Sequence, residues 1–190
     1  MVDNKDIVLA LKDMAILMEL KGENIFRCRS YSNAARQIET LQQQVTELVK
    51  REELDSLRGI GKGLARNISE LVKTGRMEAY QKLKASVPEG LLEMLEVSGI
   101  GAKRVRTIYN ELGISDLDAL GKACEAGNVE KLSGFGKRMV KSILQGITFL
   151  QKHKGKFLCS TASKEAEAIR EYLLGCSNVI NIEVTGSVRR

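Results

Sequence analysis

Three short glycine-containing strings in this chain have the residue types and spacing to bind phosphate. Each reads apolar-x-Gly-apolar-Gly, over residues 57–61, 97–101 and 132–136. Glycine permits tight backbone turns and leaves no side chain between the backbone and an approaching group. The free amides of a following helix start, with the positive end of its dipole, then attract an anion. The residues expected to form these phosphate sites are Gly59, Gly61, Gly63, Gly99, Gly101, Ala102, Gly134 and Gly136.

Basic side chains accompany each of the three strings. A lysine follows the second glycine within two residues, and an arginine lies within the next few positions. These residues are Lys62, Arg66, Lys103, Arg104, Lys137 and Arg138. The chain has 30 Lys and Arg against 24 Asp and Glu, and after residue 100 it has 15 basic against 9 acidic residues. Grouped positive charge favours a polyanion partner, here DNA held through its backbone phosphates.

Two other interpretations of the glycine strings differ in what they require. A dinucleotide-binding loop needs a third glycine, but Leu64, Arg104 and Met139 stand at that spacing, and no β-branched strand precedes any copy. A scaffold of helix-turn-helix units for protein contacts needs no phosphate site and stays open as an alternative.

Helical patterns flank every glycine string. Apolar residues recur four and seven positions after the second glycine, and helical patterns precede the strings at 48–54, 88–95 and 117–129. Pro88 takes a first-turn position in the second of these. Each repeat is therefore predicted to be a helix, a glycine hairpin and a second helix. Further patterns predict a helix over 3–20 that ends at Gly22, and another over 24–41.

The last forty residues have a different pattern. Residues 164–174 are predicted to be a helix capped by Ser163 and ended by Gly175, and Ile180, Ile182 and Val184 alternate as in a half-buried strand. One strand cannot form a sheet alone, so the chain is interpreted as truncated.

Composition narrows the class of protein further. With 43% apolar and 28% charged residues, and no apolar run of about 18, the chain is expected to be a globular protein of the cytoplasm without a membrane partner. Its four cysteines and single His153 lack metal-ligand spacing, so zinc and disulfides are not expected. Cys28, Cys124, Cys159 and Cys176 are interpreted as reduced thiols.

Four segments together resemble the family X DNA polymerases over essentially the whole chain: FRCRSYSNAA (26–35), LRGIGKGLARNISELVKTGR (57–76), VSGIGAKRVRTIYNELGI (97–114) and TGSVRR (185–190). The third hairpin resembles the bacterial and archaeal branch. The resemblance implies a mainly α chain with three helix-hairpin-helix motifs, followed by the truncated start of an α/β nucleotidyltransferase palm. The implied domains are a small 5′-phosphate and DNA-binding domain over 1–84, a fingers or thumb-type DNA-binding domain over 85–150, and the incomplete palm over 151–190.

The resemblance also implies a nucleotide site near the end of the chain. In the family, the Gly-Ser turn and the second arginine bind the triphosphate of the incoming dNTP, which assigns Gly186, Ser187 and Arg190, with Lys156 as a lesser candidate. The carboxylates that hold two Mg²⁺ ions in the family follow this turn, so these 190 residues are expected to bind DNA without polymerising it.

The resemblance also assigns roles in DNA binding to residues outside the nucleotide site. Arg27 and Tyr31 match its 5′-phosphate positions. The lysine that forms a Schiff base with a 5′ sugar phosphate is replaced by Asn67, which cannot form an imine. A monovalent cation, Na⁺ or K⁺, held by hairpin carbonyls in some members would lie at Leu57 and Ile60, or at Val97 and Ile100.

The resulting prediction is the DNA-binding part of a family X polymerase that fills gaps in DNA repair, acting on gapped or nicked duplex. The alternative is a non-catalytic, structure-specific helix-hairpin-helix module. A third hypothesis, a hairpin-type glycosylase with Asp118 as its acid, is weak because Asp116 and Asp118 fit a helix start.

Overall fold

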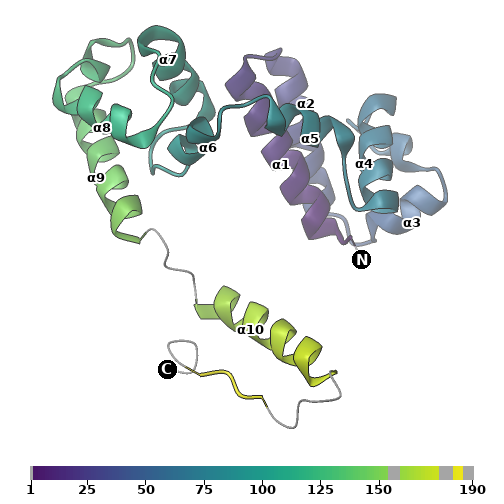
Figure 1. The fold of residues 1–190 in the computed structure, drawn as a ribbon. Coiled ribbons are helices and arrows are strands. Elements are labelled where there is room, and N and C mark those ends of the chain that lie inside the picture. The colour runs from purple at the N-terminus through teal and green to yellow at the C-terminus, as the bar shows by residue number, and fades with distance from the viewer. Residues whose placement is uncertain (1, 154–158, 176–181, 186–190) are drawn as a thin grey trace. The chain divides into compact units, whose positions relative to one another are not determined.

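The computed structural model describes residues 2–153, 159–175 and 182–185, and it divides the chain into two compact units, Met1–Thr148 and Phe149–Arg190 (Figure 1). Helices account for the secondary structure of the described residues, which confirms the mainly α fold class. The domain limits at residues 84 and 150 stay predictions.

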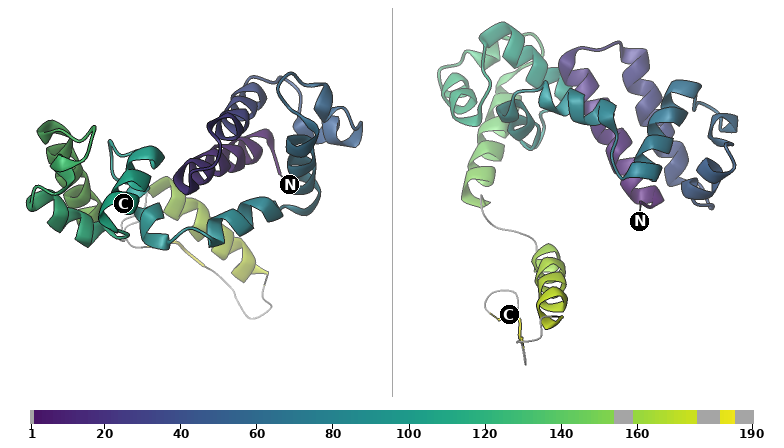
Figure 2. Two further views of the ribbon diagram at one scale, coloured as in Figure 1. Left: turned by 90° about the horizontal axis from the view of Figure 1, so that it is seen from above. Right: turned by 45° about the vertical axis from the view of Figure 1, so that its right-hand side comes forward.

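The chain begins with two helices packed side by side, α1 (Asn4–Lys21) and α2 (Ile25–Glu39) (Figures 1 and 2). Asp3 and Asp6 form a reciprocal capping box at the start of α1, and Gly22 ends it in the left-handed conformation. Asn24 caps α2 by accepting from the amide of Phe26 at 2.8 Å. Both helices were predicted from the sequence, and both are confirmed.

Four shorter elements follow: α3 (Val45–Lys50), the 3-10 helix η1 (Leu54–Ser56), α4 (Lys62–Thr74) and α5 (Glu78–Ala85). No sequence signal had indicated α5. After α3 the chain reverses at Glu52, whose φ of 58° lies in the left-handed region. Among the described residues, Glu52 is the only one other than glycine with a positive φ.

The helices α1 to α4 enclose one hydrophobic core. Its fully buried side chains come from each of these helices, and include Ile7, Leu11, Ile38, Val45 and Ile68. The helix α1 contributes most because it contacts α2, α4 and α5. The first hairpin is therefore part of the same core as α1 and α2, to which it contributes Ile60, Leu64 and Ile68.

The second half of the first unit contains α6 (Glu89–Leu95), α7 (Ala102–Leu112), α8 (Leu117–Glu125), the 3-10 helix η2 (Val129–Lys131) and the start of α9 (Lys137–His153). Pro88 precedes α6 as its N-cap residue, one position earlier than expected. Asp116 caps α8 by accepting from the amide of Ala119 at 2.7 Å, as expected from the sequence.

The second unit corrects two predictions. Its helix α10 (Cys159–Leu174) begins before Ser163, so Ser163 lies inside the helix and is not its cap. The described part of the predicted strand, residues 182–185, is irregular. The carbonyl of Ile182 accepts from Nε of Arg170 at 3.2 Å, whereas a strand would pair it with another strand. Ile180 lies outside the described residues, and the palm start stays a prediction.

A glycine in α6 allows a close approach that the fold requires. A Cβ at Gly90 would lie 3.0 Å from the carbonyl carbon of Ser115 and closer still to its oxygen, whereas a Cβ at Gly121 in α8 would meet only Ile147 Cδ1 at 4.0 Å. Backbone atoms cannot move aside as the end of a side chain can. Alanine is therefore expected to be tolerated at Gly121 and to disturb the fold at Gly90.

We predict that Gly90→Ala lowers the free energy of unfolding by about 1–3 kcal/mol, because the added methyl group forces the backbone apart. Gly121→Ala is the matched control, and its better helix propensity should raise stability by up to about 1 kcal/mol. Urea unfolding followed by circular dichroism measures both. Equal effects of the two substitutions would contradict the close approach at Gly90.

Candidate nucleic-acid interface

The three glycine strings form the same backbone turn. In each, the amide of the fourth residue donates to the carbonyl of the first: Ile60 to Leu57 at 3.0 Å, Ile100 to Val97 at 3.1 Å, and Phe135 to Leu132 at 3.1 Å. The third residue has φ of 84° at Gly59, 90° at Gly99 and 84° at Gly134. A positive φ at this position is typical of a type II turn and favours glycine there.

Each turn leads directly into a helix, which is α4, α7 or α9. Gly61 and Gly101 are the N-cap residues of α4 and α7, and neither helix start has a side-chain cap. The carbonyls of Gly61, Gly101 and Gly136 accept from the amides three and four residues later. The amides before those positions have no partner within the helix, so they can donate to an anion.

A buried apolar residue fixes each turn against the protein. Ile60, Ile100 and Phe135, between the two glycines of each string, are all buried. The apolar residues seven positions after the second glycine, Ile68, Ile108 and Ile143, are also fully enclosed. The turn is therefore anchored from inside while its glycines stay exposed.

The basic residues predicted beside the turns lie at the surface. Lys62, Arg66, Lys103, Arg104, Lys137 and Arg138 are all exposed. Arg104 has a second role, since its guanidinium donates to the carbonyl of Gly99 at 3.2 Å and so braces the second turn. The remaining cations are placed to add positive charge beside uncapped amides.

The second and third turns share one hollow. It has a volume of about 390 Å³, and its wall includes Gly101 and Lys103 from the start of α7 together with Ser133 and Gly134 from the third turn. Glu19 of α1 also lines it, a residue that the sequence did not single out. The two hairpins are thus close enough to contact one continuous ligand.

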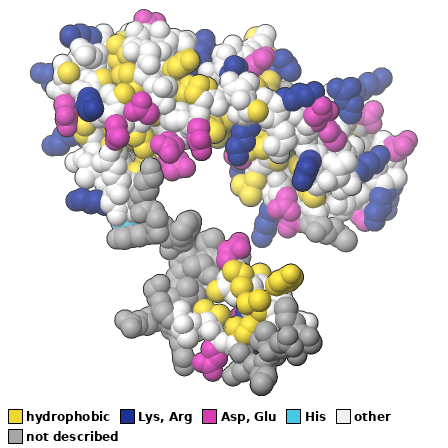
Figure 3. All heavy atoms as spheres, in the orientation of Figure 1, with side chains coloured by type: hydrophobic (Ala, Val, Ile, Leu, Met, Phe, Trp, Pro, Cys, Tyr) yellow, Lys and Arg dark blue, Asp and Glu magenta, His cyan; other side chains and the backbone are white. Residues whose placement is uncertain are grey.

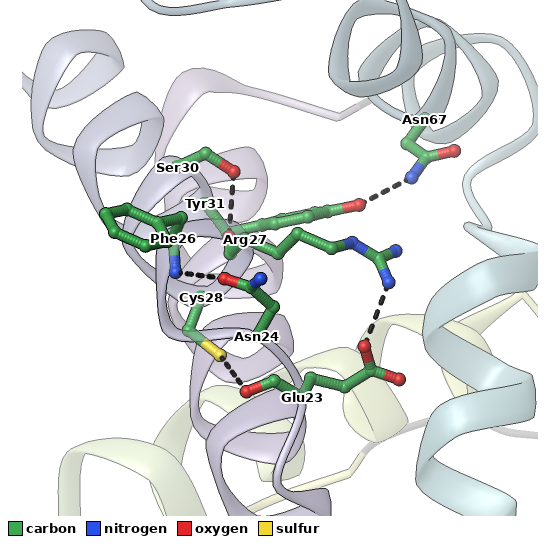
Figure 4. A network of polar contacts seen from close by, with 8 residues as sticks. All are labelled: Glu23, Asn24, Phe26, Arg27, Cys28, Ser30, Tyr31 and Asn67. Carbon is green, nitrogen blue, oxygen red and sulfur yellow. Dashed lines mark hydrogen bonds and ion pairs between the residues drawn. The ribbon is translucent and has the colours of Figure 1, made fainter.

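The predicted 5′-phosphate residues lie in a polar network around the start of α2 (Figure 4). Arg27 forms an ion pair with Glu23 at 2.9 Å, and both side chains are exposed. Tyr31 is only 7% exposed, and its hydroxyl accepts from Nδ2 of Asn67 at 2.8 Å. The i,i+4 spacing of Glu23 and Arg27 is a sequence signal that could have indicated their pairing.

Several predicted site residues cannot be placed. Lys156, Gly186, Ser187 and Arg190 lie outside the described residues. The carbonyls of Leu57 and Val97 accept within their own turns, and a cation at these or at Ile60 and Ile100 stays a prediction. Within the described ranges, no group of three or more His, Cys, Asp or Glu side chains could hold a metal.

Two of the four cysteines have described side chains. Cys28 and Cys124 are buried and free. Burial raises the pKa of the Cys124 thiol to about 11. It also raises the pKa of Cys28, with a smaller contribution from the charge of Glu19. Both thiols stay protonated and unreactive near neutral pH.

We predict that the Tyr31–Asn67 hydrogen bond couples α2 to α4. Asn67→Ala and Tyr31→Phe should each lower the free energy of unfolding, and a double-mutant cycle should give a coupling of about 1 kcal/mol because the bond is partly buried. Urea unfolding of the two single variants and the double variant measures this coupling. Strictly additive losses would show that the two side chains do not interact.

The chain contains no helix among its described residues that is long and apolar enough to cross a membrane.

Residues 2–77 match the model of a helix-hairpin-helix domain, and residues 91–147 match that of a SAM-like helix-hairpin-helix tandem. These matches agree with one hairpin in the first half of the unit and two in the second.

A relative extends the comparison to nearly the whole sequence. Over 186 residues, or 98% of this chain, the sequence is 36% identical to the DNA polymerase/3′-5′ exonuclease PolX of Bacillus subtilis (strain 168). The match covers 32% of that protein, so the chain spans about a third of the length of this relative. The resemblance indicated by the hairpins is thereby confirmed: over nearly its whole length, the chain is similar to part of a family X DNA polymerase.

Proposed function

We propose that this chain binds DNA through the phosphate backbone, as the DNA-binding part of a family X polymerase. The observation that carries the proposal is the threefold repeat of one turn, each copy with exposed glycines, a helix that starts directly after the turn, and adjacent cations. Backbone amides recognise phosphate oxygens and carry no information about the base, so binding is independent of sequence.

The shared hollow of the second and third turns favours one duplex as the ligand. Two amide sites on one wall can hold phosphates of the same DNA, and Lys103 adds a point charge there. No residue of the first hairpin lines this hollow, so that hairpin would hold a separate stretch of the DNA. This division suits a gapped or nicked duplex, with the DNA on either side of the break held separately.

The activity of a full-length protein is a further part of the proposal. A family X polymerase transfers nucleotides from dNTPs with two bound Mg²⁺ ions, whose carboxylate ligands hold them about 4 Å apart. In this chain, Ser187 and Arg190 would contribute to the triphosphate site. The similarity to a polymerase over nearly the whole chain favours this function over that of a non-catalytic binding module.

The hairpin cations provide a direct test of DNA binding. Replacing Lys103 and Lys137 by alanine should weaken binding to all duplex sequences alike, and should lower the slope of log K against log salt by about 1.8, or about 0.9 for each phosphate that is no longer neutralised. Fluorescence anisotropy with labelled duplexes over a series of salt concentrations measures this slope.

The matched control for this test replaces two lysines outside the hairpins, Lys5 and Lys84, which are both exposed. It makes the same change in net charge and should leave the slope nearly unchanged. An equal slope in the hairpin variant and the unsubstituted chain would mean that the hairpins do not face DNA.

The network around Arg27 generates a second test. A gapped duplex with a 5′-phosphate should bind more tightly than one with a 5′-hydroxyl, and Arg27→Ala should abolish the difference. Glu23→Gln should increase it, because the neutral amide no longer competes for the guanidinium. Preference for the 5′-phosphate that survives Arg27→Ala would exclude this residue from the site.

A further inference from the structure

One face of α4 carries cations that extend beyond the first hairpin turn. Lys62, Arg66, Ser69 and Lys73 are spaced four, three and four residues apart, so their side chains lie on the same side of the helix. All four line one hollow, of about 230 Å³, whose opposite wall includes Glu52 and Asp55. We call this face the α4 strip.

The cations of the α4 strip are available to a ligand. Lys62, Arg66 and Lys73 are exposed, and no ion pair in the described ranges joins any of them to a carboxylate. On the surface where Figure 1 places α3 and α4, Figure 3 shows many Lys and Arg side chains with acidic ones among them. Glu52 and Asp55 line the same hollow, but neither forms an ion pair with a cation of the strip.

The adjacent face of α4 provides the contrast. One position further along, Gly63, Asn67, Glu70 and Thr74 have the same spacing and carry no cation. Their polar groups are already occupied: Asn67 donates to Tyr31, Glu70 accepts from the amide of Glu78 at 3.1 Å, and Thr74 donates to the carbonyl of Glu70 at 2.8 Å. Positive charge on α4 is thus confined to the strip.

We propose that the α4 strip binds the phosphodiester backbone of DNA as a continuation of the first hairpin. From Lys62 to Lys73 the helix rises about 16 Å, or about five nucleotides at 3.4 Å of axial rise in one strand. The hairpin amides hold one phosphate at the helix start, Arg66 and Lys73 hold later ones, and the Ser69 hydroxyl donates between them. DNA therefore follows α4 along the strip and not along the face of Asn67.

The acidic wall of the hollow limits where the strand can lie. Glu52 and Asp55 are exposed carboxylates opposite the cations, and they repel phosphate. The strand must then stay on the α4 side of the hollow. This geometry makes Asp55 a negative determinant of affinity, since an amide in its place would remove repulsion without adding a cation.

The experiment rests on the proposed DNA binding and uses the 190-residue chain with a labelled gapped duplex. Arg66→Ala/Lys73→Ala leaves Lys62 at the turn in place. The double substitution should lower the salt slope by about 1.8 and weaken binding about 60-fold near 0.1 M salt, since each neutralised phosphate contributes about eightfold there. Asp55→Asn should tighten binding.

The control is Lys5→Ala/Lys84→Ala, which makes the same change in net charge away from α4 and should leave the salt slope unchanged. Circular dichroism and urea unfolding show whether each variant keeps its fold. A folded strip variant with an unchanged slope, or a slope lowered equally in the control, would overturn the proposal for α4 while DNA binding stands. Failure of the unsubstituted chain to bind the duplex would instead refute the proposed function.

Discussion

The left-handed conformation of one glycine in each hairpin is the constraint on which the rest of the interface depends. With φ near +85° at Gly59, Gly99 and Gly134, the chain reverses in four residues and closes on a single hydrogen bond. The reversal buries the apolar residue that follows and directs the next helix start outward. A side chain at these positions would strain the turn and also cover the amides. Local geometry and phosphate binding thus require the same residue.

Burial distinguishes the hairpins from an ordinary connection between two helices. A loop of exposed glycines alone would be mobile, and its amides would have no fixed direction. Here Ile60, Ile100 and Phe135 hold each turn to the core from the inside. The donors are therefore oriented before any ligand arrives, which reduces the entropic cost of binding. The polar surface can be rich in glycine because the apolar anchor supplies the rigidity.

The sequence predicted much of this because the hairpin signal is local. Turn glycines, apolar spacing and helix ends such as Gly22 and Asp116 depend on a few neighbouring residues, and they appeared as expected. Contacts between distant segments could not be read in this way. The hydrogen bond between Tyr31 and Asn67 joins residues 36 positions apart. No regular spacing of apolar residues in the sequence indicates such a pair. The prediction of a strand near Ile182 was wrong for a related reason. Alternating apolar and polar residues indicate which side of a strand would be buried, but a strand also needs a neighbouring strand for its backbone hydrogen bonds.

The bond between Tyr31 and Asn67 also bears on how charge is distributed around α4. An amide at position 67 satisfies a partly buried tyrosine hydroxyl, whereas a protonated lysine there would have to be desolvated beside it. Cations are better placed on the exposed side of the helix. Arg66 and Lys73, each one residue before a member of the Asn67 face, stay hydrated until a polyanion displaces the water. A helix advances about 100° per residue, so this single step turns the positive face away from α2 and toward the hollow beside η1. The hydrogen bond between α2 and α4 therefore determines which side of α4 can attract DNA.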